Sequence, residues 1–323
     1  MRMLHFTRRL GAVVVALVAL ALLAAACSGG DGEDRGPVLT PVTAAYLPQT
    51  VSSDVTVGPN RFVVGLLDQE QNAPVLGADL HFRFFKLEGD EQILKTEADA
   101  RAVTIERSYT HTHDDGTVES HEAGETGAYV ADVSFDSPGT WGIEVTGTVE
   151  GQAIDAVKPI FTVRERSLSP VLGEPAPRTV QTILGDVSDI AEIDTSDPPN
   201  PGMHDITIAD AVTSGQPSVI VFATPAFCAS RICGPTKDLV DQLYQRYQEQ
   251  ANFVHVEPYD IERTRRGDCA SLFECRVPAV DEWGLQTEPW VFLVDSEGNI
   301  AAKFESIVTL DELEATLTTL LTP

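Results

Sequence analysis

The spacing of apolar residues changes several times along the chain of 323 residues. One continuous apolar run occupies residues 11–26. Between about residues 51 and 165, short segments alternate apolar and polar residues or stay apolar for the length of a strand, and turn residues separate them. The pattern predicts an all-β unit without helices, with strands near residues 61–67, 80–87, 127–135, 140–149 and 153–163.

Beyond residue 205 the pattern combines apolar runs of strand length with apolar residues at helical spacing. Such a mixture indicates an α/β arrangement. Strands are expected at residues 218–223, 252–257, 290–294 and 300–304, and helices over about 235–250 and from residue 310 onwards. Between the two regions, proline, serine and aspartate are frequent in residues 166–204, which predicts a linker that leads into a second domain.

The N-terminus has the pattern of an export signal. Three arginines precede the apolar run, which is about 16 residues long and so shorter than the roughly 20 that span a bilayer, and small residues precede Cys27. The segment resembles a bacterial lipoprotein signal, although Ala24 stands where leucine is more usual. The resemblance implies a lipid on Cys27 and a protein anchored to the cell membrane, facing the extracytoplasmic side. An ordinary secretory peptide or an anchor helix is the alternative.

The length after the signal exceeds what one ordinary core holds, so two domains are expected. The first resembles immunoglobulin-like β-sandwich modules of the bacterial envelope, on the stretch from Gly127-Ala-Tyr to Gly139-Thr-Trp-Gly. The predicted organisation is a signal peptide over 1–26, a flexible tether over 27–50, the sandwich over 51–165, the linker and start of the second domain over 166–204, and the second domain over 205–323.

Two cysteines follow the apolar run at 218–223. Residues five apart in a helix are about 7.5 Å apart along its axis, which is too far for a disulfide, so Cys228 and Cys233 can pair only if a loop joins them. A helix predicted to begin near Pro235 would stabilise a thiolate at its N-terminus. This arrangement predicts a reactive cysteine with a second sulfur to resolve what the first attacks.

The order of elements over residues 205–320, and Leu172-Gly-Glu-Pro-Ala-Pro before them, resemble an extracytoplasmic, redoxin-like thioredoxin domain. The resemblance implies an α/β thioredoxin-like fold, a nucleophilic cysteine after the first central strand, and Pro289 in a cis peptide against it. Family members usually carry Cys-x-x-Cys, whereas four residues intervene here. Two registers therefore stay open: Cys228 attacks and Cys233 resolves, or Cys233-Gly-Pro-Thr236 corresponds to the family motif. We prefer Cys228 as the attacking sulfur.

The other cysteine pair, Cys269 and Cys275, lies in an irregular insertion before Pro289. An even number of cysteines in an exported chain favours disulfides. We predict a structural disulfide between these two residues, which would order the loop. A second redox pair that exchanges with the first is the alternative.

Several histidines are candidate metal ligands. His111 and His113 point the same way if they lie on a strand, and His121 follows, so that a copper or zinc site is conceivable in this predicted hairpin loop. A solvated polar loop is the simpler interpretation. We interpret His255 as a buried, hydrogen-bonded residue and His204 as an ordinary exposed polar residue.

The formal charge of −27 excludes nucleic-acid binding, since phosphate contacts need a basic face. The sequence thus predicts a membrane-anchored, extracytoplasmic thiol–disulfide oxidoreductase that acts on thiols or disulfides of an exported protein and uses no cofactor. The alternative is a copper-handling or non-catalytic binding lipoprotein whose disulfide is structural.

Overall fold

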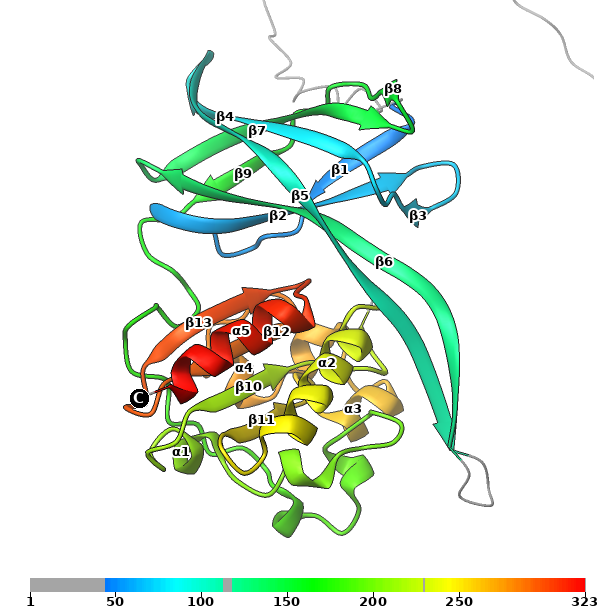
Figure 1. Cartoon of the computed structure of the whole chain (residues 1–323), viewed down its shortest axis with the longest axis vertical. Helices are drawn as coiled ribbons and strands as arrows, with labels where there is room; N and C mark the ends of the chain where they lie inside the picture. Colours follow the sequence, from blue (N-terminus) through cyan, green and yellow to red (C-terminus); the bar gives the residue numbers. More distant parts are fainter. Residues whose placement is uncertain (1–43, 113–117, 229, 323) are drawn as a thin grey trace, which may run out of the picture. The chain divides into compact units, whose positions relative to one another are not determined.

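The computed structural model describes residues 44–112, 118–228 and 230–322, without the side chains of 108–112 and 118–123. Its strands and helices are shown in Figure 1. In this part of the chain no helix is both long enough and apolar enough to cross a membrane. Residues 43–323 form one unit by their contacts, so the predicted boundary near residue 165 stays a prediction.

Nine strands make up one sheet in the N-terminal part. Seven of them follow the order β1-β2-β6-β5-β4-β7-β8, while β3 pairs with β2 and β9 with β7. Their bounds are β1 Tyr46–Thr50, β2 Gly58–Asp68, β3 Ala73–Pro74, β4 Asp79–Glu88, β5 Glu91–Thr112, β6 Val118–Phe135, β7 Gly139–Val149, β8 Gln152–Ala153 and β9 Ile160–Val163.

The immunoglobulin-like sandwich predicted for this part is wrong, because the strands form a single, nearly closed, barrel-like sheet. The 22 residues of β5 explain the difference. The first part of this strand, up to Ala100, pairs with β4, and the part from Arg101 onwards pairs with β6. One strand therefore joins two groups of strands that a sandwich would keep separate. Phe62, Phe84 and Trp141 are completely buried in the core that the sheet encloses.

The C-terminal part contains a four-stranded sheet in the order β11-β10-β12-β13. Strand β10 runs parallel to β11 and antiparallel to β12, and β13 is antiparallel to β12. The bounds are β10 Ser218–Phe222, β11 Asn252–Val256, β12 Trp290–Val294 and β13 Ile300–Glu305, with helices α1 Ile208–Ala211, α2 Cys233–Tyr247, α3 Ile261–Arg266, α4 Pro278–Glu282 and α5 Leu310–Leu321.

Both faces of this sheet are covered, so its central strands are buried at every position and are apolar everywhere except at Ser218. Val219 and Val221 face apolar residues of α2 and α5, whereas Ile220 and Phe222 face α1, α4 and Trp283. The amphipathic spacing from residue 310 places Leu313 and Leu317 of α5 in the core. The thioredoxin-like α/β class predicted from the sequence is nevertheless wrong for the protein. Strands hold 39% of the described residues and helices 21%, so that the described chain is mostly β.

Residues 166–204 are more than a spacer. The backbone N–H groups of Gly173 and Ala176 donate to the carbonyls of Ile300 and Gly298, which attaches this segment to the edge of the sheet at β13. Three short 3-10 helices follow, η1 Leu184–Asp186, η2 Ile190–Glu192 and η3 Pro201–Met203, and a fourth, η4 Leu272–Cys275, lies later in the chain. The segment belongs to none of the strands of the sheet, but its attachment places polar residues beside the sheet.

Candidate functional site

The cysteine pair lies where β10 ends and α2 begins. Cys233 is the first residue of α2 and is completely buried, whereas Cys228 in the preceding turn is partly exposed. Their Sγ atoms lie within 4.8 Å of each other. The turn brings together two sulfurs that a continuous helix would hold apart, as the spacing of the two cysteines requires.

The environment of Cys228 favours its thiolate. A hydrogen bond with the Cys233 thiol lowers the pKa of Cys228 to about 6, against the opposing effect of burial. Ser230 Oγ, 3.1 Å from Cys228 Sγ, and the backbone N–H groups of Ile232 and Cys233 contribute in the same direction. These N–H groups are the free donors at the start of α2, which stabilise an anion. At neutral pH most Cys228 side chains are therefore thiolates.

The environment of Cys233 has the opposite effect. Burial raises the pKa of Cys233 far above its ordinary value, and the hydrogen bond to Cys228 together with the negative charge on that sulfur raises it further. Two thiols within reach of each other thus differ in both exposure and acidity. In thiol–disulfide exchange, an asymmetry of this kind is expected between the sulfur that attacks and the sulfur that stays protonated until resolution.

A third group, the carboxylate of Glu288, lies close to the two cysteines. The peptide bond between Glu288 and Pro289 is cis, and Pro289 is buried directly before β12. A carboxylate oxygen of Glu288 lies within 4.8 Å of both sulfurs, and Tyr259 Oη donates a hydrogen bond of 2.8 Å to Glu288 Oε2. Two sulfurs and an oxygen at this spacing can share a proton or hold a thiophilic metal ion. Sequence reasoning named Pro289 but missed Glu288, whose position next to that proline was the available signal.

Cys269 and Cys275 form a disulfide in the structure. Cys275 is buried at the end of η4, and its carbonyl oxygen accepts a hydrogen bond of 2.7 Å from the backbone N–H of Asp260. The bridge therefore closes part of the loop between α3 and α4 on itself, and the hydrogen bond from Asp260 holds this loop to the chain that precedes α3. Such a position suits a structural role.

Other predicted site residues lie outside what the structure describes. Cys27 and His113 are outside the described residues. The backbones of His111 and His121 belong to β5 and β6, where they pair with Glu119 and Tyr109, but their side chains are outside the described part. The copper or zinc site suggested for this hairpin stays a prediction.

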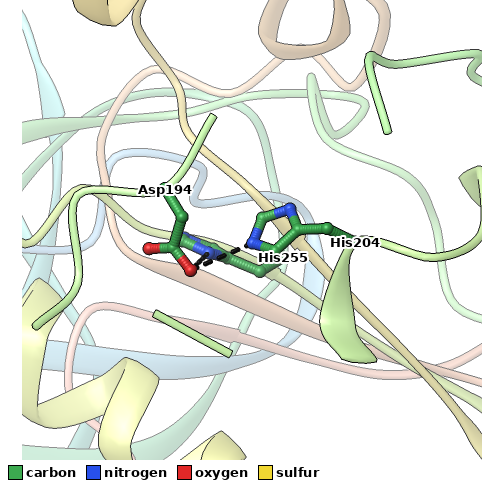
Figure 2. A group of neighbouring side chains, drawn as sticks. All are labelled: Asp194, His204 and His255. Atoms are coloured by element: carbon green, nitrogen blue, oxygen red, sulfur yellow. Dashed lines mark hydrogen bonds and ion pairs between the residues drawn. The ribbon is translucent and has the colours of Figure 1, made fainter. Parts of the chain in front are cut away.

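A second polar cluster, formed by Asp194, His204 and His255, is buried beside the sheet (Figure 2). All three residues are at most 2% exposed. The prediction for His255 is confirmed, since its Nε2 lies 2.9 Å from the carbonyl oxygen of Ala223. The prediction for His204 as an exposed residue is wrong, because η3 turns its side chain towards Asp194. Nothing in the local sequence marks Asp194, which lies in the segment predicted as linker.

The charges in this cluster depend on burial and on the one carboxylate. Burial lowers the pKa of His204 and outweighs the opposing hydrogen bond to Asp194. Burial alone would also lower the pKa of His255, but its interactions with Asp194 and the negative charge of Glu257 together outweigh burial and raise that pKa. Despite burial, the two histidines hold the pKa of Asp194 far below its usual range. Asp194 is thus a buried carboxylate that needs a positive partner.

Comparisons with family models, with curated proteins and with solved structures found no match to the chain.

Proposed function

We propose that the protein is an extracytoplasmic thiol–disulfide oxidoreductase, anchored to the membrane through a lipid on Cys27, that acts on a disulfide or dithiol of an exported protein. The observation that carries the proposal is the asymmetry between a partly exposed Cys228 with a lowered pKa and a buried Cys233 with a raised pKa. A reactive thiol beside a protected resolving thiol is the arrangement that exchange chemistry requires.

The first step is an attack by the Cys228 thiolate on one sulfur of the partner disulfide. A new S–S bond forms between Cys228 and the partner, the partner's own S–S bond breaks, and the released sulfur leaves as a thiolate that takes a proton from water. Cys233 does not compete for the partner, because its sulfur is buried. The partial exposure of Cys228 thus supports Cys228 as the attacking cysteine.

The second step is resolution by Cys233. Its proton passes to the nearby Glu288 carboxylate, and the resulting thiolate attacks Cys228 Sγ, which releases the second partner sulfur as a thiolate. The protein ends with a Cys228–Cys233 disulfide and the partner with two thiols. Read backwards, the same steps oxidise a partner dithiol, and the reduction potentials of the two couples set the direction.

The acidity of Cys228 provides the direct test. The rate of alkylation of the reduced protein by iodoacetamide should rise with pH to a plateau with a midpoint of about 6, because the thiolate is the nucleophile. Mass spectrometry should place the label on Cys228 and leave Cys233 unlabelled. In Cys233→Ala, which removes the largest stabilising contact, the midpoint should move up towards the ordinary value of about 8.5. A wild-type midpoint already near that value would contradict the proposal.

The role of Glu288 is tested separately. Glu288→Gln keeps the shape and the contact with Tyr259 but removes the proton acceptor, so resolution of a preformed mixed disulfide on Cys228 should slow by about 10²-fold. Stopped-flow release of a chromogenic thiol from that mixed disulfide measures the step. Glu297→Gln, an exposed glutamate in the turn before β13, is the matched control and should resolve at the wild-type rate. An unchanged rate in Glu288→Gln would exclude the carboxylate as the base.

A further inference from the structure

The buried cluster of Asp194, His204 and His255 lies apart from the thiol chemistry proposed above and has the donor set of a metal site. One acceptor atom of each residue lies within 4.8 Å of the other two. Asp194 Oδ2 is 3.0 Å from His204 Nε2 and 3.5 Å from His255 Nδ1. Dashed lines mark these interactions in Figure 2. Ligands of a tetrahedral ion with bonds of about 2.0–2.1 Å are separated by about 3.3 Å, so both distances fit around one ion.

When its ring is neutral, His255 directs the free lone pair of Nδ1 towards the place where the ion would lie, beside Asp194 Oδ2. Its Nε2–H donates to the carbonyl oxygen of Ala223, so Nδ1 of the neutral ring carries the lone pair. Nδ1 is buried and makes no hydrogen bond among the described residues, because 3.5 Å from a carboxylate oxygen is too long. Metal-bound histidines characteristically donate their other ring N–H to such a carbonyl. Either a proton on Nδ1, which the raised pKa of His255 favours, or a metal ion in its place must therefore lie between this nitrogen and the Asp194 carboxylate.

A hydrogen bond also fixes the orientation of the Asp194 carboxylate. Its Oδ1 accepts a hydrogen bond of 2.8 Å from the backbone N–H of Ser196, which leaves Oδ2 to face the two imidazoles. Lys237, whose charge acts on Asp194, is paired with another carboxylate, since its Nζ lies 2.6 Å from Asp241 Oδ2. Two of the three donors, those of His255 and Asp194, are therefore oriented by a contact behind them, as the ligands of protein metal sites are.

A route for the ion is present as well. Both histidines line a cavity of about 930 Å³ between the segment before η2 and helices α3 and α4. Six carboxylates and two arginines lie along its wall, which favours the entry of a cation. The carboxylates belong to Asp189, Glu192, Glu257, Asp260, Glu262 and Glu282.

We propose that Asp194, His204 and His255 bind a divalent transition-metal ion, with Zn²⁺ as the best match, and that the fourth position of the ion faces the cavity. Two imidazoles and one carboxylate are borderline donors that suit zinc, and three protein ligands with an open position are typical of sites that bind water or a further ligand.

Metal binding to the purified protein, stripped with a chelator, tests this proposal. All measurements use a Cys228→Ser/Cys233→Ser background so that the thiols contribute no ligand. Titration should reveal one Zn²⁺ per chain, and Co²⁺ should give the intense visible absorption of a tetrahedral site. His204→Gln should weaken binding by about 10²-fold. His81→Gln, in which the lost imidazole is exposed beside Glu97 and Asp99, is the matched control and should bind as before.

A third variant keeps the test decisive if His204→Gln disturbs folding. His204→Cys supplies a new ligand at the same place, so its Co²⁺ complex should gain a sulfur-to-cobalt charge-transfer band that the background lacks. Absence of Zn²⁺ binding in the background, or unchanged binding in His204→Gln, would overturn the proposal. So would loss of the bound ion in a His111→Ala/His113→Ala/His121→Ala variant, since the ion would then belong to the hairpin.

Discussion

Replacing Cys228 with serine is expected to abolish thiol–disulfide exchange, lowering the rate with a small disulfide by on the order of 10³-fold or more, because a hydroxyl is a far weaker nucleophile than a thiolate. Cys233 cannot substitute, since it is completely buried and its pKa is raised. The rate of reaction between the reduced protein and a chromogenic aromatic disulfide measures the loss.

Cys233→Ser should have a different outcome. The first step remains, so that a mixed disulfide between Cys228 and the partner accumulates and can be isolated on a non-reducing gel and identified by mass. A double Cys269→Ser/Cys275→Ser variant is the control: we predict that this pair is structural and takes no part in exchange, so the variant should turn over as the wild type does. Should Cys228→Ser instead trap the partner through Cys233, the assignment of the two sulfurs would be reversed.

The second large effect concerns stability. Asp54→Ala is expected to lower the free energy of unfolding by about 3–5 kcal/mol, because it leaves the partly buried charge of Lys303 and several hydrogen-bond donors without their partner. Asp54 is almost fully buried and accepts hydrogen bonds from the backbone N–H groups of Leu168 and Ser169 and from the Ser167 and Ser169 hydroxyls. Lys303 Nζ lies 3.5 Å away. Chemical denaturation measures the loss.

Asp155→Ala is the matched control, since Asp155 is exposed, and it should change stability by no more than about 0.5 kcal/mol. Although burial would raise the pKa of Asp54, its hydrogen bonds and Lys303 outweigh this effect and lower it. The stabilisation is therefore fully present above the unfolded value of about 3.9 and disappears as pH falls through the lower folded value. Asp54→Ala should accordingly lose less stability on acidification than the wild type. Equal acid sensitivity of the two proteins would contradict this account.

Local sequence identifies the elements that carry the cysteines. The apolar run before Cys228 forms β10, the spacing after Pro235 forms most of α2, and the periodic leucines after Thr309 form α5. These elements are predictable because each buries a side chain at fixed spacing along its own backbone. The longest strand, β5, was not predicted at all, because charged and polar residues interrupt its apolar positions.

The fold class could not be predicted from the sequence for a related reason. Whether strands form two stacked sheets or one sheet depends on which strands pair, and alternation along a single strand carries no information about its neighbours. Because β5 pairs with β4 over one part and with β6 over the other, the strands form one sheet and not two.

The sequence by itself determined that two cysteines, five residues apart, follow a buried strand and meet the start of a helix. It therefore determined that the two sulfurs belong to one local site, because chain connectivity over a few residues fixes their approach. Only the tertiary structure decided which groups surround them. Glu288 reaches the sulfurs from 55 residues beyond Cys233, and Asp194 meets His255 from a segment with no regular pattern. Such partners are selected by packing across the sheet, where sequence distance places no constraint.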